Sequence, residues 1–122
     1  FSGVSTSGVS TLQIQIGAGS VASTGYISTA VNTTNGGTAS ITSGFLIIAT
    51  PAATDTLYGS VVINALGSNI WTSTGSLQQS TSGRLSASAG GVTLSGTLDR
   101  LRITTANGTD TFDAGSINIL YE

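Results

Sequence analysis

The fold class of this chain is decided by residues 12–16, Leu12-Gln13-Ile14-Gln15-Ile16. Apolar and polar side chains alternate strictly here, and a period of two places them on opposite faces of an extended strand. Elsewhere Thr, Ser, Val, Ile, Asn and Gly dominate, while the good surface helix formers Glu and Lys are nearly absent. We therefore expect an all-β domain without a sizeable helix.

Other extended segments follow at short spacing. We expect strands near residues 12–16, 26–31, 38–42, 44–50, 57–65, 70–72, 76–80, 84–89, 92–95, 98–104 and 116–121. Turns are expected at Gly75, Gly83, Gly90-Gly91 and Gly96, and Asn107-Gly108 is a hairpin signal. Several of these eleven segments are short pieces, so we expect about eight to ten strands, and strands at this spacing predict an antiparallel β-sandwich, most simply a jelly roll.

Residues 44–50 are apolar on both faces, which predicts a central strand in a two-layer core. Pro51 should end this strand, and residues 51–55 should form a loop. Residues 1–11 are expected to be an extended lead-in, and residues 12–122 a single domain. Because the first residue is Phe1 and not Met, we expect a fragment or a processed product.

Charge is scarce in this sequence. Only 7% of the residues are charged, against about a quarter in a typical domain. With three basic residues the chain lacks the field that attracts phosphates, so nucleic acid is excluded as a partner. Ser and Thr supply 39 of the 122 residues, yet the mean hydropathy is +0.32. We interpret this combination as surface buried against identical copies of the chain.

The sequence lacks residue types that most enzymes use for catalysis. The chain has no His and no Cys, so the commonest general base and the usual zinc ligands are missing. Many Ser hydroxyls are present, but no His can activate one. Gly17-Ala18-Gly19 begins like a dinucleotide fingerprint, but no helix is expected after it. We therefore predict a non-enzymatic protein without a cofactor.

Arg100 and Arg102 are two of the three basic residues, and their spacing places them on one face of a strand. They are candidates for holding an anionic sugar, a lipopolysaccharide phosphate or a small carboxylate at a subunit junction. The alternative, which we favour, is an ion pair with Asp99, Asp113 or Glu122, within one chain or between chains.

Asp110 and Asp113 flank Phe112 in a region rich in turn residues. They are weak candidates for a calcium site, since hard cations prefer clustered carboxylates. Turn formation, in which Asp bonds to nearby backbone, is the simpler explanation. We therefore assign no metal to the chain.

Aromatic residues offer a further candidate site. Trp71, together with Tyr26, Tyr58 and Tyr121, could form a platform on which sugar rings stack. Packing in the core or at an interface is the alternative, and we favour it for Trp71. In that case Ile70 should face outward. The candidate ligand-binding residues are thus Arg100, Arg102, Trp71 and Tyr58.

The second half of the chain resembles the ending of virion proteins from tailed bacteriophages. The residues that carry this resemblance are Asn69-Ile70-Trp71, residues 94–104 (LSGTLDRLRIT) and residues 107–122 (NGTDTFDAGSINILYE). Tail fibres, tailspikes and tail needles have such endings, and the knob of a P22-like tail needle is similar in size. The resemblance covers roughly residues 58–122 and does not extend to residues 1–57.

The resemblance implies a knob at the distal tip of a trimeric fibre, often a jelly roll like that of tumour necrosis factor. It further implies a place on the virion, a lead-in from a preceding fibre at residues 1–11, and contact with a host glycan, lipopolysaccharide or outer-membrane component. It names no catalytic residue. Three alternatives stay open, which are a monomeric carbohydrate-binding module, an enzyme such as a depolymerase fragment, and a capsid decoration or head-fibre protein.

Overall fold

The computed structural model describes residues 1–34, 36–81 and 83–122. Within these residues the chain forms strands and loops, and no helix is long and apolar enough to cross a membrane. The strands are β1 (Ser2–Thr6), β2 (Leu12–Ala18), β3 (Ser20–Val21), β4 (Ile27–Asn32), β5 (Thr38–Ile41), β6 (Phe45–Leu46), β7 (Leu57–Gly67), β8 (Ile70–Gln79), β9 (Leu85–Thr93), β10 (Arg100–Thr105) and β11 (Phe112–Ser116).

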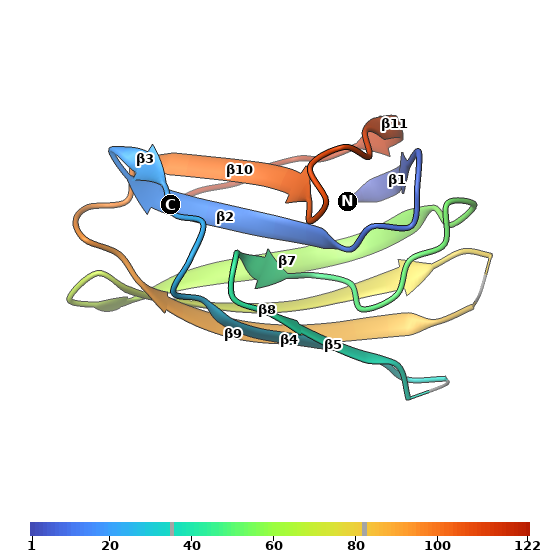
Figure 1. The fold of residues 1–122 in the computed structure, drawn as a ribbon, viewed down its shortest axis with the longest axis horizontal. Helices are drawn as coiled ribbons and strands as arrows, with labels where there is room; N and C mark the ends of the chain where they lie inside the picture. The colour runs from blue at the N-terminus through green and yellow to red at the C-terminus, as the bar shows by residue number, and fades with distance from the viewer. Residues whose placement is uncertain (35, 82) are drawn as a thin grey trace.

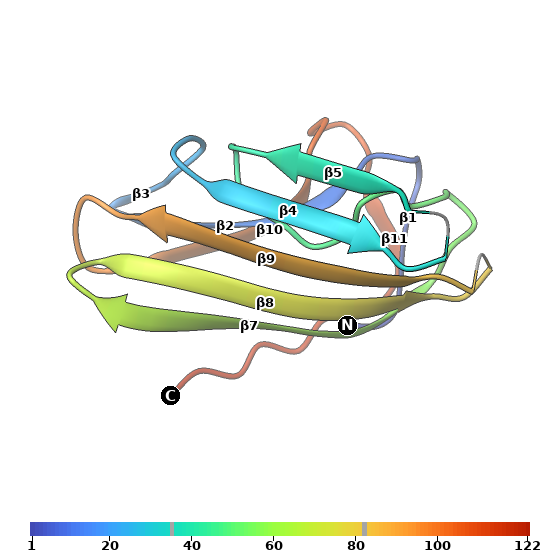
Figure 2. The same cartoon turned by 90° about the horizontal axis from the view of Figure 1, so that it is seen from below.

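Two layers of antiparallel strands face each other (Figure 1). The larger sheet has the order β11-β1-β7-β8-β9-β4-β5, and the smaller has the order β10-β2-β3, with β6 paired to β2. Figure 2 shows β7, β8, β9, β4 and β5 side by side as one broad face. The predicted all-β class is confirmed, and the layers are those of a β-sandwich.

The core lies between the layers and begins with the alternation in β2. Leu12, Ile14 and Ile16 are buried in it, as predicted. Gln13 and Gln15 point to the other face, but they are buried as well, because the loop before β6 covers them. Ser43 supplies the bonds, since its hydroxyl donates to Gln13 Oε1 (2.8 Å) and its carbonyl accepts from Gln15 Nε2 (2.7 Å).

The apolar stretch after Gly44 is buried as expected, but the prediction of a central strand is wrong. Among the described residues of this stretch, only Phe45 and Leu46 form a strand with β2, and Ile47 N adds one bond to Leu12 O (3.0 Å). The stretch lies against β2, β4 and β9. Serine hydroxyl groups of the larger sheet accept two of the backbone N–H groups of this stretch. Leu46 N donates to Ser28 Oγ (2.7 Å), and Ala49 N donates to Ser86 Oγ (3.3 Å). The loop predicted at residues 51–55, beginning with Pro51, is present.

The opening residues are part of the sandwich, which differs from the expected lead-in. β1 pairs with β11 and meets β7 at Val4 and Leu57, both of which are buried. The terminal amine of Phe1 also donates to Gly59 O (3.0 Å). An apolar side chain at position 4 in an otherwise hydroxyl-rich stretch is enough to fix β1 against the core.

Two predicted turns lie inside strands. Gly75 is within β8, and Gly90-Gly91 is within β9, so four expected short pieces form two long strands. Close packing explains the glycines: a Cβ at Gly90 would lie 2.9 Å from the Phe45 ring, and one at Gly75 would lie 2.8 Å from Val61 Cγ2. These glycines make room for neighbours instead of turning the chain.

The C-terminal region also differs from expectation. Asn107-Gly108 does form a turn, in which Asn107 Oδ1 accepts from the backbone N–H groups of Thr109 and Asp110 (both 3.1 Å). The turn does not make a hairpin, because β10 and β11 belong to different sheets. The last strand, expected at residues 116–121, is instead β11, which pairs with β1 and ends at Ser116.

Candidate functional site

The sandwich is open along one edge. An apolar groove of about 590 Å³ lies there between β7 and β10. Its walls include Val61, Ile63, Trp71, Leu98, Leu101 and Ile103. Among the described residues, β10 pairs only with β2, and β7 beyond Gly59 pairs only with β8, so each wall presents an unpaired strand edge. Free strand edges beside apolar side chains are sites where another strand can add.

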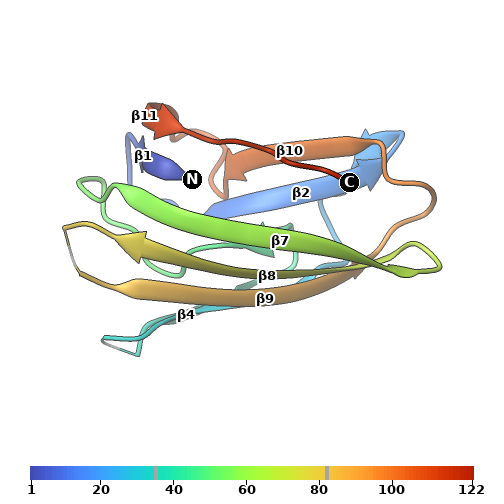
Figure 3. The same ribbon diagram turned by 180° about the vertical axis from the view of Figure 1, so that it is seen from behind.

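Residues 117–122, here called the C-terminal segment, lie along this groove (Figure 3). Ile117 packs against the core, but Leu120 and Tyr121 are 86% and 93% exposed. No backbone hydrogen bond holds this segment in the part of the chain that the structure describes. The alternation in this segment predicted a strand, but among the described residues the segment pairs with no strand.

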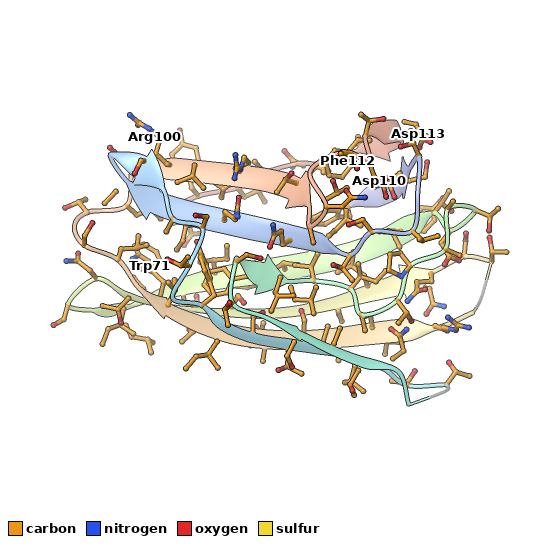
Figure 4. The ribbon with its side chains drawn as sticks, viewed as in Figure 1. Trp71, Arg100, Asp110, Phe112 and Asp113 are labelled. Carbon is orange, nitrogen blue, oxygen red and sulfur yellow. The ribbon has the colours of Figure 1, made fainter. Side chains whose placement is uncertain are left out.

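Trp71 lies near the start of β8, between the layers (Figure 4). Its ring packs against the core and lines the groove, while Ile70 faces outward at 41% exposure. The indole Nε1 is buried and has no hydrogen-bond partner among the described residues. A buried donor of this kind costs about 1–3 kcal/mol, so this atom marks a place where an acceptor from outside could bind.

Arg100 and Arg102 lie on β10, with side chains on the same strand face. Arg100 Nη1 is 3.4 Å from Asp99 Oδ2, and both side chains are about half exposed. This is one of the ion pairs that the sequence suggested. Arg102 has no acidic partner in the part of the chain that the structure describes; its Nε donates to Gln15 Oε1 (2.8 Å), and its Nη2 donates to the same oxygen.

The two arginines and Trp71 do not form one site. Leu101 and Ile103, which alternate with the arginines, line the groove, so the guanidinium groups belong to the opposite face of β10. Figure 4 shows Arg100 on the outer side of the smaller sheet and Trp71 between the layers. A ligand at the arginines and a ligand in the groove would therefore be separate.

The predicted aromatic platform is wrong for Tyr26. This residue is buried, its hydroxyl donates to Ile16 O (2.9 Å) and accepts from Ile16 N (2.8 Å), and its ring meets Phe45 edge-on at 5.0 Å. Burial raises the pKa of the Tyr26 hydroxyl above its ordinary value, although the bond to Ile16 and the charge of Arg102 act in the opposite direction. Tyr26 is a core residue.

Tyr58 and Trp71 are also too far apart to act as one platform. In the β7–β8 register Tyr58 is opposite Gln78, whereas Trp71 is opposite Ala65. Seven residues of strand separate the two positions, which is about 23 Å. Tyr58 lies instead over β1, where its hydroxyl would be 3.4 Å from a Cβ at Gly3. Tyr121 is in the C-terminal segment.

Asp110 and Asp113 bind different parts of the chain. Asp110 Oδ2 accepts from Ser10 N (3.0 Å), which ties the β10–β11 turn to the loop before β2. Asp113 Oδ1 accepts from the Ser5 hydroxyl in β1. Among residues 1–34, 36–81 and 83–122 no three acidic, His or Cys side chains come together as a metal site. Both carboxylates act as connections between loops or strands.

The broad face of the larger sheet was not singled out by sequence reasoning. β4, β5, β7, β8 and β9 contain no Asp, Glu, Lys or Arg. All eight charged residues lie in loops, in β10 and β11, or at the C-terminus. Large apolar side chains are exposed on these five strands, including Ile27, Val31, Tyr58, Val62 and Leu85. We call the outer surface of these strands the charge-free face.

A buried polar group was also missed. Gln79 Nε2 donates to Asn32 Oδ1 (3.2 Å), and Asn32 Nδ2 donates to Thr50 Oγ1 (2.5 Å). This group links β8, β4 and the loop after β6. Alternation in β4 signals that Asn32 points inward, but its partners are distant in sequence.

Comparison with known proteins adds no relative. No protein-family model matches the chain, no curated protein matches it, and no solved structure matches its fold.

Proposed function

We propose that this chain is a non-enzymatic, homotrimeric knob at the distal tip of a phage tail appendage, where it contacts the host envelope. The observation that carries the proposal is the charge-free face, five adjacent strands without a charged residue and with several large apolar side chains exposed. Depletion of charge is the compositional feature that separates the core of a protein interface from ordinary surface.

Copies of the same chain are suitable partners for this face. Two copies meet there without like-charge repulsion, and no charge has to be desolvated. A surface that is both apolar and uncharged gives little solubility by itself, which favours permanent burial over transient contact. Permanent interfaces of this kind resemble a domain core cut in half.

The finer fold that we propose is a jelly roll. In support, the chain passes between the two layers six times among the described strands, from β1 to β2, β3 to β4, β5 to β6, β6 to β7, β9 to β10 and β10 to β11. The consecutive hairpin strands β7, β8 and β9 would be an addition to the simple eight-stranded form. Trimeric assembly is part of the same proposal and comes from the resemblance to phage knobs.

The assignment to a phage appendage rests on the resemblance of residues 94–104 and 107–122. These residues supply β10, the Asn107-Gly108 turn, β11 and the C-terminal segment. They therefore include one wall of the groove and the segment that lies along it. The residues that resemble phage proteins lie mostly at this edge of the sandwich, which supports a role for the edge in assembly.

Binding of the host would depend on three equivalent sites. A glycan, a lipopolysaccharide or an outer-membrane component binds each subunit weakly, and linkage in one trimer converts later contacts into intramolecular ones. The half-exposed Arg100 at the outer side of the smaller sheet is available to an anionic group of such a receptor. A small anion at a subunit junction is a further possible ligand of the same side chain.

The test compares two single-charge variants. Thr74→Lys introduces a cation at the centre of the charge-free face, where Thr74 lies between Val62 and Ala89. Thr97→Lys makes the same change at an exposed position in the β9–β10 connection. Binding to lipopolysaccharide-containing outer-membrane vesicles is measured by co-sedimentation. We expect Thr74→Lys to bind at least about 100-fold more weakly than Thr97→Lys, because it loses avidity.

Three outcomes would contradict the proposal. Equal binding by both variants, with Thr74→Lys monomeric, would indicate a monomeric binding module. Release of sugar fragments from the vesicles would indicate an enzyme. Absence of vesicle binding by the unmodified chain and both variants would remove the proposed contact with the envelope.

A further inference from the structure

We propose that the groove between β7 and β10 is completed by the C-terminal segment of a second copy, which adds to β10 as an antiparallel strand. This inference rests on the proposed homotrimer and names the residues that one subunit gives to the next. The donated residues are 117–121, and the receiving edge is β10.

The receiving edge has backbone groups to satisfy. β10 forms a ladder with β2 from Arg100 to Thr105, and its other edge carries no strand in the part of the chain that the structure describes. An unpaired edge is normally shielded by charge, by proline or by a covering element. Here Leu101 is 44% exposed, and Ile103 lines the groove beside it. The edge is therefore open to addition of a strand.

The donated segment has the pattern of a strand. Ile117, Ile119 and Tyr121 alternate with Asn118 and Leu120, yet no backbone hydrogen bond of these residues is present among the described residues. In Figure 3 the segment runs back along β10 in the direction opposite to that strand. Strand addition between chains joins a segment that has no backbone hydrogen bonds to a strand edge that has none. The C-terminal segment and the free edge of β10 are such a pair.

Within one chain, the segment is held away from the plane of the smaller sheet. Ser116 pairs with Ser2, and Gly115 lies so close to Gly3 that a Cβ would be 2.4 Å from its carbonyl. Ile117 is then fixed against the core between the layers. A segment from a second copy has no such tether to this subunit, so it can approach β10 from outside and align with it.

The chemistry of the groove suits this occupant. Glu122, at the end of the segment itself, is the one charged side chain among the described residues that line it, and the terminal amine of Phe1 is bonded to Gly59 O, so a neutral apolar strand enters without loss of an ion pair. Trp71 Nε1 is a buried donor on the groove wall and needs an acceptor. A backbone carbonyl of an incoming strand is such an acceptor.

The geometry of exchange favours a ring. Donor segment and receiving edge are different surfaces, so each contact is heterologous, and the assembly closes after two subunits if the rotation between them is two-fold and after three if it is three-fold. Closure after three subunits would give each copy one donated and one received strand. The exchange is compatible with either closure, and the number three comes from the proposed homotrimer.

The test uses the absence of cysteine from the chain. One variant carries Ile119→Cys in the C-terminal segment, and a second, tagged for size, carries Leu101→Cys on β10. The two chains are refolded together and mildly oxidised. A third variant, Ile103→Cys, replaces Leu101→Cys in a parallel sample to cover a neighbouring register. Val9→Cys, which is exposed in the loop between β1 and β2 and lies outside both the groove and the charge-free face, is the control for random collision.

We expect crosslinked pairs of tagged and untagged chains with Leu101→Cys or Ile103→Cys, and none above background with Val9→Cys. A double variant that crosslinks only within its own chain, together with no mixed crosslink, would overturn the exchange. If the unmodified chain is trimeric but neither β10 position crosslinks between chains, the donated strand is wrong and the proposed function stands. If the chain is monomeric, the homotrimer itself is wrong.

Discussion

At the scale of single residues, Tyr26 connects the parts of the sandwich. It precedes β4 of the larger sheet, its hydroxyl bonds to both backbone groups of Ile16 in the smaller sheet, and its ring packs on Phe45 of the buried stretch between them. One side chain therefore contacts three elements that are distant in sequence. This explains why a tyrosine, and not an aliphatic residue, occupies a buried position.

Replacement of Tyr26 by Phe should show the value of these two bonds. Tyr26→Phe keeps the ring on Phe45 but leaves the buried Ile16 N–H without a partner, while Ile16 C=O still accepts from Ala22 N (3.0 Å), so we expect a loss of about 1–3 kcal/mol in the free energy of unfolding. Chemical denaturation measures it. Tyr58→Phe is the control, and we expect about 0.5 kcal/mol or less because Tyr58 is half exposed. Equal effects would show that the Ile16 bonds add nothing.

The raised pKa of Tyr26 predicts how stability depends on pH. Below about pH 10 the hydroxyl is protonated in both the folded and the unfolded chain, so its contribution is fully present. Above that pH the unfolded chain releases the proton and the folded chain retains it, so the free energy of unfolding should fall as pH rises through the folded pKa. Denaturation from pH 8 to pH 11, about the window concerned, measures the fall.

Tyr26→Phe should reduce this dependence on pH, whereas Tyr58→Phe should preserve it. An unchanged slope in Tyr26→Phe would assign the fall to other groups.

At the scale of elements, the β1–β11 pair depends on a close backbone contact. Gly115 has φ +85°, and a Cβ there would lie 2.4 Å from both the carbon and the oxygen of the Gly3 carbonyl. Gly19, between β2 and β3, has φ +72° with nothing within 4 Å of its missing Cβ. Both glycines have a positive φ, which disfavours any other residue. Only at Gly115 would a side chain also collide with neighbouring atoms.

We expect Gly19→Ala to lower the free energy of unfolding by about 1–2 kcal/mol, because alanine must adopt a left-handed backbone conformation there and meets no other obstacle. Gly115→Ala should cost more, because β11 must also move away from β1, and the amide protons of these two strands should exchange faster. Thermal denaturation and hydrogen exchange measure the two effects. Equal destabilisation by the two variants would contradict the close contact between β1 and β11.

The elements that sequence predicts well are those whose signal is local. Alternation in β2 marks its buried face because one side of that strand meets the core, and Pro51 marks the end of the buried stretch. Gly90-Gly91 misleads, because the reason for glycine is the ring of Phe45, which approaches from far away in sequence. Local pattern cannot distinguish a glycine that turns the chain from one that makes room.

The same limit applies to the candidate site. Spacing placed Arg100 and Arg102 on one strand face, but the partner of Arg102 is Gln15, which pairing of β10 with β2 brings opposite. The expected final strand failed because β11 needs β1 as its partner, and that pairing shifts the strand toward Phe112. The groove is formed by β7 and β10, whose meeting depends on the whole fold.

At the scale of the whole molecule, the charge-free face predicts how assembly responds to salt. Ion pairs between subunits would be screened at high ionic strength, but a face without charge has none to lose. We expect the oligomer to persist, or to be strengthened, as sodium chloride rises from low to molar concentration. Sedimentation velocity across that range measures it. Dissociation at high salt would instead place the arginines in the interface.

The central claim is that three copies of this chain assemble through surface that a single copy leaves exposed. Sedimentation equilibrium of the unmodified chain at micromolar concentration gives its mass in solution without reference to shape. We predict a single species at three times the 12.1 kDa of one chain. A stable species of 12.1 kDa would contradict the account, because the charge-free face and the open groove would then be ordinary exposed surface.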